Sequence, residues 1–423
     1  MTDRPVTEAA QLKKLRDLIK HLRRGNEFYQ SRLSKAGITS EVDSLKAFAR
    51  DMPFTTKMDL VWDREEFPPY GSNLTFPIED YSRFCHSSGT TRGPLPSLDT
   101  AGSWDAMLDC WDRVYEAASV GVDEVIFFAF SFGPFLGFWT AFESATRRGN
   151  LSIPGGGLSS MARLQAMVTH DADVICCTPT YALRLGELYA EHEGDEIAAY
   201  RLKKIIVAGE PGGSLPEVRN QISDLWKGAE IFDHHGMTEV GPVTYGHPDK
   251  PLSLFVIEEA YFVEVIDRET HQEVGLGEKG ELVITTLTRT ACPLLRYRTG
   301  DLVEKTFFQP PGSEEPVFCL EGGVLGRVDD MVVIRGVNVY PTAIEKIIRG
   351  FPDVVEFQIG QTTRQSMAEL EVTIEAKVGA SSDLADRVAR ELADAFTLRI
   401  PVRLAEPGSL PRFEFKSKRW IKQ

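Results

Sequence analysis

The chain has 423 residues, which is long for one typical domain, and 42% hydrophobic and 26% charged residues are ordinary values for a globular protein with a sizeable core. The net charge of −15 argues against a nucleic-acid partner, because a phosphate backbone requires a basic face. The charged N-terminus lacks the apolar core of a signal peptide, and the most apolar run, 125–139, is too short to cross a bilayer. We therefore expect a cytoplasmic protein with no membrane partner.

The first predicted element is an amphipathic helix. Leu12, Leu15, Ile19 and Leu22 recur at helical spacing, and Gly25 is a plausible stop. After it, helical stretches alternate with short apolar strands at 125–130, 172–178 and 202–209. This alternation predicts an α/β layered domain.

In the later part of the chain the pattern of apolar and polar residues changes twice. Segments 260–266 and 280–287 flank a turn-rich stretch and predict an antiparallel β-subdomain. Alternating residues at 370–378 then predict a half-exposed strand, and Leu384, Val388, Leu392 and Phe396 predict a one-faced helix. About three strands and two helices would complete a small α+β domain. We expect a large N-terminal domain, 1–326, and a small mobile domain, 327–423.

The six cysteines contain no CxxC spacing, so neither a zinc ribbon nor a redox motif is visible. Cys176 and Cys177 are adjacent in a predicted strand. Their side chains should therefore point to opposite faces and cannot readily chelate one metal ion together.

The stretch GRVDDMVVIRGVNVYP, residues 326–341, is the most informative in the chain. Two β-rich runs are separated by the Arg335–Gly336 turn and preceded by the acidic pair Asp329 and Asp330. Glycines that bracket charges between apolar runs favour a hinge and a mobile loop over a packed core.

A Ser/Thr/Gly-rich loop, SSGTTRGP, occupies residues 87–94. Its hydroxyl groups and free amides can surround phosphate oxygens, although a polar turn would look the same. No Lys-Ser/Thr pair follows, so it is not the loop of phosphoryl-transfer NTPases. The predicted phosphate contacts are Ser87, Ser88, Gly89, Thr90, Thr91 and Arg92.

Several other polar residues could have either a functional role or an ordinary structural one. Glu239 in GMTEVG could be a solvated carboxylate, and Asp301 in YRTGD could cap a turn. On charge alone, the segment that contains Lys416, Lys418 and Arg419 is typical of a solvated basic tail. Neighbouring His234 and His235 diverge on a strand, which argues against a metal site of their own.

Five motifs occur together: SSGTTRGP, GMTEVG, YRTGD, GRVDDMVVIRGVNVYP and SLPRFEFKSKR. In that order and at those separations they resemble the phenylacetate–coenzyme A ligase family, a branch of the adenylate-forming enzymes. The resemblance runs from segments 28–37 and 53–60 to the end of the chain. It implies ATP, Mg²⁺ and coenzyme A as cofactors and substrates, and a small carboxylic acid as the group that is activated.

The resemblance also implies roles for residues around the nucleotide. Glu239 would hold Mg²⁺, and Asp301 with Arg327 would bind the ribose. The family commonly has Tyr at the place of His235, and its usual Gly-Lys-Pro is Arg92-Gly93-Pro94 here. The remaining implied nucleotide contacts are Gly209, Glu210, Pro211, Asp233, His234, Gly236, Met237 and Thr238.

The resemblance further implies a two-step reaction. Lys416 coincides with the family lysine that serves the first half-reaction, although Phe415 replaces the glycine that usually precedes it. Asp329 coincides with the family hinge about which the C-terminal domain rotates. The implied coenzyme A channel contains Arg335, Gly336, Val337, Asn338 and Tyr340. The implied acyl pocket contains Phe130, Phe132, Phe135, Ala208 and Gly236.

The aromatic run at 127–139 is compatible with ordinary core, but an aromatic-lined slot suits an aryl or arylacetic acid. An aryl–coenzyme A ligase is therefore the leading hypothesis. One alternative is an adenylating enzyme that passes the acyl group to a carrier-protein thiol, an amine or a hydroxyl, and another is a non-catalytic nucleotide-binding protein. A homodimer is compatible with the sequence.

Overall fold

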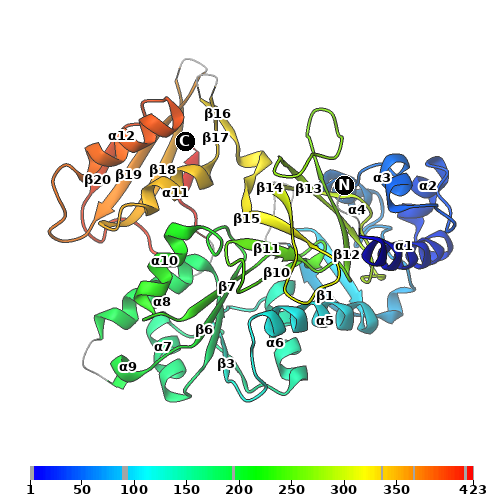
Figure 1. The fold of residues 1–423 in the computed structure, drawn as a ribbon, viewed down its shortest axis with the longest axis horizontal. Coiled ribbons are helices and arrows are strands. Elements are labelled where there is room, and N and C mark those ends of the chain that lie inside the picture. Colours follow the sequence, from blue (N-terminus) through cyan, green and yellow to red (C-terminus); the bar gives the residue numbers. More distant parts are fainter. Residues whose placement is uncertain are drawn as a thin grey trace.

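The protein is described from a computed structural model, which covers residues 4–87, 94–192, 196–334, 337–364, 367–413 and 417–422. Figure 1 shows a large body that contains two sheets and N-terminal helices, with a smaller domain packed on one side. The predicted α/β class, with a large N-terminal and a small C-terminal domain, is confirmed. In the described residues no helix is long and apolar enough to cross a membrane.

A parallel sheet with strand order β4-β3-β5-β6-β7 forms the centre of the α/β layer. One face packs against helices α5 and α6, and the other against α7, α8 and α10, so both faces are buried. Such strands read as continuous apolar runs. The bounds are β3 (Ile126–Phe128), β4 (Ser152–Pro154), β5 (Val174–Cys177), β6 (Lys204–Ala208), β7 (Glu230–His234), α5 (Ala101–Ala117), α6 (Leu136–Arg148), α7 (Ser160–Thr169), α8 (Pro179–Glu191), α9 (Glu196–Ala199) and α10 (Pro216–Leu225).

An antiparallel sheet with order β10-β11-β15-β14-β13-β12 packs beside it. The expected antiparallel pairing is confirmed, because Tyr261 to Ile266 of β12 pair with Thr286 to Glu281 of β13. The register of β14 and β15 sets Asp301 opposite Arg327. The bounds are β10 (Thr244–Gly246), β11 (Ser253–Val256), β12 (Tyr261–Ile266), β13 (Lys279–Thr286), β14 (Tyr297–Phe308) and β15 (Val317–Arg327).

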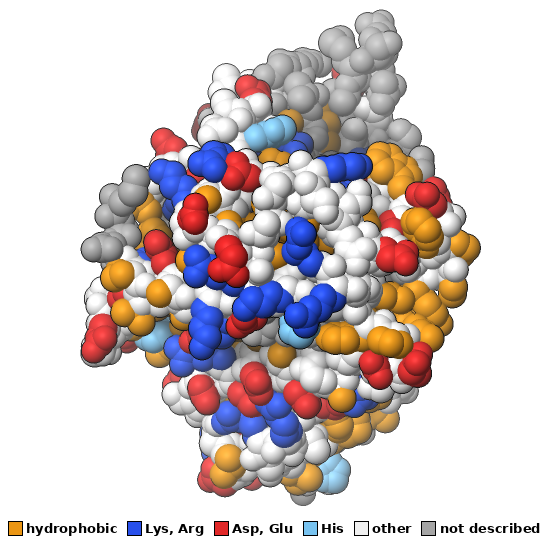
Figure 2. Space-filling model, turned by 90° about the vertical axis from the view of Figure 1, so that its right-hand side faces the viewer, with side chains coloured by type: hydrophobic (Ala, Val, Ile, Leu, Met, Phe, Trp, Pro, Cys, Tyr) orange, Lys and Arg blue, Asp and Glu red, His pale blue; other side chains and the backbone are white. Residues whose placement is uncertain are grey.

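The N-terminal helices cover the end of the antiparallel sheet. Helix α1 buries Leu15, Ile19 and Leu22 of the predicted apolar stripe against α2, α3 and Leu295, together with Leu18, which the prediction did not include, while Leu12 is half-buried. On this side of the molecule acidic and basic side chains are interspersed (Figure 2). The bounds are α1 (Pro5–Gly25), α2 (Glu27–Lys35), α3 (Leu45–Asp51), α4 (Lys57–Glu66), η1 (Ile78–Asp80), β1 (Tyr81–His86), β2 (Pro96–Thr100), β8 (Gly236–Met237) and β9 (Gly241–Pro242).

The small C-terminal domain, which we call the lid, has its own hydrophobic core. Its sheet has the order β20-β19-β18-β21, one strand more in the described residues than the sequence predicted, because the short C-terminal segment pairs in parallel with β18. The bounds are η2 (Val328–Asp330), β16 (Val332–Ile334), β17 (Val337–Val339), α11 (Pro341–Arg349), β18 (Val354–Arg364), β19 (Met367–Ala376), α12 (Leu384–Phe396), β20 (Val402–Ala405) and β21 (Trp420–Lys422).

The stretch 326–341 differs in part from its prediction as a hinge and mobile loop. Its β-rich runs form the antiparallel hairpin β16–β17. Val332, Ile334 and Val339 are buried in the lid core. The turn predicted at 335–336 lies outside the described residues, but the valines and the isoleucine of the two runs provide an apolar face that packs. The prediction missed this packing.

Candidate active site

A cavity of about 710 Å³ opens where the parallel strands end. Cys176, Ala208 and His234, at or near the carboxyl ends of β5, β6 and β7, all line it. In open α/β sheets the crevice outside the carboxyl ends of the strands is the usual ligand site. Tyr297, Thr299 and other residues of the antiparallel sheet form the opposite wall.

One end of the cavity is apolar and aromatic. Phe130 stacks on Phe138 with ring centroids 4.2 Å apart, and Phe135 packs edge-on against Phe138. The apolar lining consists of Trp111, Phe130, Phe135, Leu136, Phe138, Cys176, Ile206 and Ala208. Burial raises the pKa of the Cys176 thiol to about 12, so this group stays a neutral thiol near pH 7.

The predicted acyl-pocket residues divide into two groups. Phe130, Phe135, Ala208 and Gly236 line the cavity, whereas Phe132 packs behind it against Trp139 and Phe142. Gly236 is required by the close pairing of β8 with β9, since a Cβ there would lie 2.8 Å from the carbonyl oxygen of Gly241.

The predicted ribose site adjoins the polar end: Arg327 lines the cavity, whereas Asp301 and His235 lie outside the lining. Arg327 Nη1 donates to Asp301 Oδ1 at 3.0 Å, and His235 Nε2 lies 3.1 Å from Asp301 Oδ2. A carboxylate has more acceptor positions than these two bonds use, so Asp301 can also accept from a diol. The structure therefore brings together Asp301, Arg327 and His235, which are far apart in sequence.

Asp233 has a different setting from its neighbours. Its carboxylate accepts from Ser214 Oγ at 2.5 Å and from His234 N at 3.0 Å, and it lies outside the cavity lining. Burial raises its pKa to about 6. Asp233 thus orders the end of β7 and does not face the cavity in this structure.

Glu239 forms an ion pair that the sequence did not reveal. Lys57 Nζ lies 2.9 Å from Glu239 Oε1, and both residues line the cavity. Lys57 is the first residue of α4, whose start is fixed by the capping box of Thr56 and Asp59. The Thr-x-x-Asp spacing could have identified that helix start, but nothing local links residue 57 to residue 239.

Whether a magnesium ion suits this place depends on the donors present. In the described residues there is no group of three or more His, Cys, Asp or Glu side chains that could hold a metal ion. Mg²⁺ commonly takes one or two carboxylates and completes its shell with phosphate and water oxygens. Glu239 alone therefore fits a nucleotide-bound magnesium and does not fit a protein-only metal site.

Arg289 orders the main chain that carries Glu239. It is 1% exposed and donates to the carbonyl oxygens of Thr238 and Glu239 at 3.0 Å each. Two further bonds, at 2.8 and 2.6 Å, join its guanidinium to the Asp99 carboxylate. The Asp99 carboxylate raises the pKa of Arg289 against the effect of burial, so the guanidinium stays charged. No motif in the sequence pointed to this residue.

The phosphate-loop prediction falls largely outside the described residues, since Ser88, Gly89, Thr90, Thr91 and Arg92 are not described. Its two ends are held together, because Ser87 N donates to Leu95 O and Leu95 N donates to Ser87 Oγ, both at 3.1 Å. Ser87 lines the main cavity. The loop therefore starts and ends beside Glu239.

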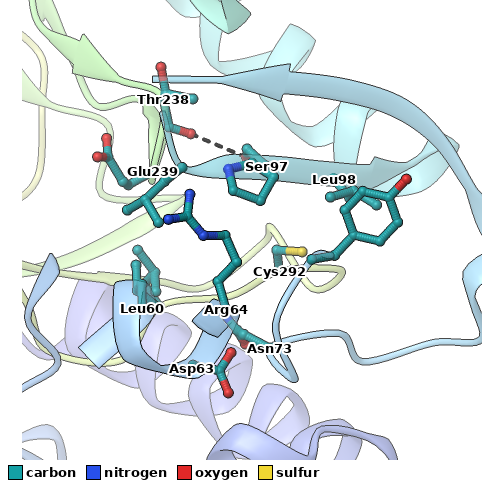
Figure 3. Close-up of a pocket in the computed structure, with 13 residues that line it drawn as sticks. Leu60, Asp63, Arg64, Asn73, Ser97, Leu98, Thr238, Glu239 and Cys292 are labelled. Carbon is teal, nitrogen blue, oxygen red and sulfur yellow. Dashed lines mark hydrogen bonds between the residues drawn. The ribbon is translucent and has the colours of Figure 1, made fainter. Parts of the chain in front are cut away.

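A second, smaller cavity of about 50 Å³ lies on the other side of Glu239 (Figure 3). Arg64 extends into it from α4, and its Nη1 donates to Pro94 O at 2.6 Å. Helix α4 thus brings one cation, Lys57, to Glu239 and a second, Arg64, to Pro94 and the smaller cavity.

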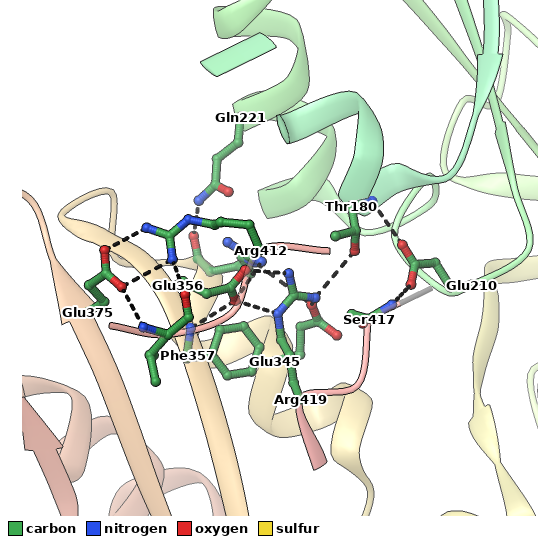
Figure 4. A network of polar contacts seen from close by, with 12 residues as sticks. Thr180, Glu210, Gln221, Glu345, Glu356, Phe357, Glu375, Arg412, Ser417 and Arg419 are labelled. Carbon is green, nitrogen blue, oxygen red and sulfur yellow. Dashed lines mark hydrogen bonds and ion pairs between the residues drawn. The ribbon is translucent and has the colours of Figure 1, made fainter. Parts of the chain in front are cut away.

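The C-terminal segment contacts the α/β domain through Glu210 (Figure 4). Ser417 N donates to Glu210 Oε2, and Thr180 N donates to Glu210 Oε1, both at 2.9 Å. Arg419 Nη1 lies 3.3 Å from Thr180 Oγ1 and binds Glu345 and Glu356 of the lid. Lys416 is not described, but the residue that follows it is fixed against the AGEP turn.

The other predicted positions are as follows. Gly209, Met237 and Thr238 line the cavity, whereas the side chain of Glu210 faces the lid, and Pro211 lies outside the lining. Asp329 lies in η2, between the last strand of the large domain and the lid hairpin. Val337 and Asn338 are in β17, and Tyr340 precedes α11; Val337 and Tyr340 lie outside the cavity lining in this arrangement. Arg335 and Gly336 lie outside the described residues.

Comparison with known proteins decides the family. The model of the AMP-binding enzyme family matches residues 38–288, and that of the AMP-binding enzyme C-terminal domain matches 336–423. The chain belongs to the AMP-binding enzyme family. A phenylacetate-coenzyme A ligase of Thermus thermophilus is 31% identical over 96% of this chain and 94% of that protein.

Solved structures agree with this assignment. A 2-hydroxyisobutyryl-CoA ligase in the postadenylation state, in complex with R3-HIB-AMP, matches with a TM-score of 0.89 at 25% identity, covering 98% of this chain and 89% of that one. The same enzyme in the thioesterification state, with 2-HIB-AMP and CoA, gives a TM-score of 0.72 at 25% identity, covering 99% and 90%. The domain arrangement of our protein thus resembles the postadenylation state more closely.

Proposed function

We propose that this adenylate-forming acyl-CoA ligase activates an aryl or arylacetic acid with ATP and passes the acyl group to coenzyme A. The observation that carries the proposal is the cavity, which joins an aromatic end to a polar end that contains Glu239, Lys57 and Arg327. Full-length similarity to a phenylacetate-coenzyme A ligase supports the aryl acid.

In the first step a carboxylate oxygen of the acid attacks the α-phosphorus of ATP. A phosphorus–oxygen bond forms, the bond to the β-phosphate breaks, and pyrophosphate leaves with the electron pair. Catalysis requires two anions to be positioned and the charge on the phosphates to be neutralised. Lys57 and Arg64 supply positive charge beside the 87–94 loop, and Asp301 holds the ribose.

Glu239 would hold the magnesium ion, which neutralises phosphate charge when bound. Lys57 Nζ lies 2.9 Å from the same carboxylate and must share it or turn towards the phosphates when the ion binds. We assign Lys416 as the cation that approaches the reacting groups from the lid, because Ser417, the next residue, is held at Glu210.

In the second step the thiol of coenzyme A attacks the acyl carbon, and AMP leaves with the bonding electron pair. Val337 and Tyr340 lie outside the cavity lining here. The lid must therefore rotate, with Asp329 in η2 as the hinge, before Val337 and Tyr340 can face the thiol arm.

Pyrophosphate release across a panel of carboxylic acids tests this proposal, measured first with ATP and magnesium and then with coenzyme A added. We expect benzoate- or phenylacetate-like acids to exceed acetate and long-chain fatty acids by roughly a hundredfold in kcat/KM, since a buried ring gains more than a buried methyl group. If acetate were the best acid, the aromatic end would be ordinary core. Adenylation without any thioester would favour a carrier-protein thiol, an amine or a hydroxyl as acceptor.

A further inference from the structure

His234 brings a buried hydrogen-bonding group to the apolar end of the cavity. The residue is 5% exposed and lines the cavity. It ends β7, where it pairs with Ala208 of β6, and its ring lies 4.5 Å from that of Trp111. It therefore stands among the side chains assigned above to the acyl group.

The contact of Nδ1 determines which ring nitrogen carries the proton. Nδ1 lies 2.6 Å from the main-chain carbonyl oxygen of Thr244. A carbonyl can only accept, so Nδ1 is the donor. Burial also lowers the pKa of His234 to about 4, so the ring is neutral near pH 7 and Nε2 carries a lone pair.

Nε2 is then an acceptor. The described residues give a hydrogen bond to Nδ1 alone, and Nε2 is not among the buried atoms that lack a partner, so it is accessible from the cavity. The other polar groups nearby are already engaged: Trp111 Nε1 donates to Thr140 Oγ1, and Asp233 accepts from Ser214. A ligand that covers this acceptor without donating to it leaves it unsatisfied, so a site that binds a ligand hydroxyl in this way discriminates strongly against the analogue that lacks the hydroxyl.

We infer that the acid activated by this protein carries a hydroxyl group that donates to His234 Nε2. The substrate class is thus a hydroxyaryl or hydroxyarylacetic acid, more specific than the aryl acid of the proposed function on which this inference rests. His234 is a specificity-determining residue: it selects the acid through its own substituent and takes no part in the transfer to phosphorus.

The test compares matched acids on the unaltered protein. Phenylacetate, its three ring-hydroxylated isomers and its three ring-methylated isomers are assayed for pyrophosphate release, because methyl is similar to hydroxyl in size but cannot donate. We expect at least one hydroxylated acid to exceed its methyl isomer by about tenfold or more in kcat/KM. Equal rates for every hydroxyl and methyl pair would overturn the inference.

Two variants test whether His234 causes the preference for hydroxylated over methylated acids. In His234→Asn the side-chain amide can still donate to Thr244 O, but the Nε2 acceptor is lost, so the hydroxyl-over-methyl ratio should fall to within about twofold. Phe138→Leu alters the apolar wall without touching an acceptor and should lower rates while keeping the ratio. A ratio that survives in His234→Asn would overturn the assignment to His234.

The same panel separates this inference from the proposed function. If aryl acids turn over without preference for a hydroxyl group, only the inference fails. If no member of the panel releases pyrophosphate while aliphatic acids do, the proposed aryl substrate fails and the inference fails with it. Because the first comparison uses the unaltered protein, poor folding of a variant does not prevent a decision.

Discussion

At the scale of single residues, the site depends on side chains that order others without facing the cavity. Arg289 is the main example, because its guanidinium joins Asp99 to the carbonyl oxygens next to Glu239. Replacing one member of a buried ion pair leaves the other charge without compensation, whereas replacing both by apolar groups is often tolerated.

We therefore expect Arg289→Met to lower the free energy of unfolding by ~3–5 kcal/mol and to abolish pyrophosphate release. Urea denaturation followed by fluorescence would measure the first effect. The double variant Arg289→Met/Asp99→Leu should regain much of the stability but not the activity, since the loop at Glu239 would still lack its donors. A single variant as stable as the exposed control Arg50→Met would contradict this role.

The ionisation of His234 gives a pH-dependent prediction. Its pKa is about 4 in the folded protein, below the ordinary value of 6.5, because burial disfavours the charged ring. Between these values the unfolded chain binds the proton more readily, so the contribution of His234 to stability is present above pH 6.5 and is lost as pH falls towards 4.

The comparison with His234→Asn isolates this effect from that of Asp233, whose raised pKa acts in the opposite direction. The free energy of unfolding of the natural protein minus that of the variant should rise by up to ~3 kcal/mol from pH 4 to pH 6.5. Denaturation curves at several pH values would show it. A difference that does not change with pH would mean that the ring is not buried in its neutral form.

How much of the site could be predicted differs from residue to residue. Glu239, Asp301, Arg327 and the turn at Gly209 lie in local motifs, so their types and order could be read directly. Lys57, Arg64 and Arg289 could not, because each meets its partner only after α4 or the antiparallel sheet has packed against the α/β layer. The sequence shows His234 beside His235, but it could not show that Nε2 carries a lone pair, because this follows from the contact of Nδ1 with the carbonyl oxygen of Thr244.

At the scale of elements, the described part of the C-terminal segment contacts the large domain at Glu210 and at Thr180. Glu210 accepts from Ser417 N and Thr180 N at the same time. The first bond crosses between domains and must break when the lid rotates, while the bonds of Arg419 to Glu356 lie within the lid and can persist.

Glu210→Gln should therefore slow adenylation by roughly tenfold or more, because a neutral amide is a weaker acceptor for the two amides that Glu210 binds. Thioester formation from supplied acyl-adenylate should be nearly unchanged, since we expect the proposed lid rotation to break this contact before that step. Single-turnover assays of the two half-reactions would separate them. Glu371→Gln, on the lid surface, is the control, and equal losses in both half-reactions would count against a positioning role.

At the scale of the whole molecule, two packed bodies are joined through η2, which we propose as the hinge. The alternation of helices and strands was sufficient to predict the α/β class, and the apolar stripes of α1 and α12 were recognised because both helices are strongly one-faced. The fourth strand of the lid sheet was not predicted, because the residues of β21 are few and pair only with a distant strand. Sequence periodicity does not report such long-range pairing.

Asp329→Pro tests the hinge, because proline fixes its own φ and restricts the preceding residue. We expect one half-reaction to be lost and the other largely retained. If the variant is held in the arrangement seen here, the retained step should be adenylation. Small-angle scattering with and without coenzyme A would show whether the lid still moves, and unchanged overall turnover would rule out rotation at Asp329.

We propose that one cavity joins an aryl acid to AMP and then to a thiol. Mass spectrometry of a complete reaction, with ATP, magnesium, coenzyme A and a hydroxyarylacetic acid, tests it most directly. We predict an aryl-coenzyme A thioester in a one-to-one ratio with AMP, and loss of both in Glu239→Gln. AMP formed without any thioester, or a thioester formed only with acetate or fatty acids, would contradict the account.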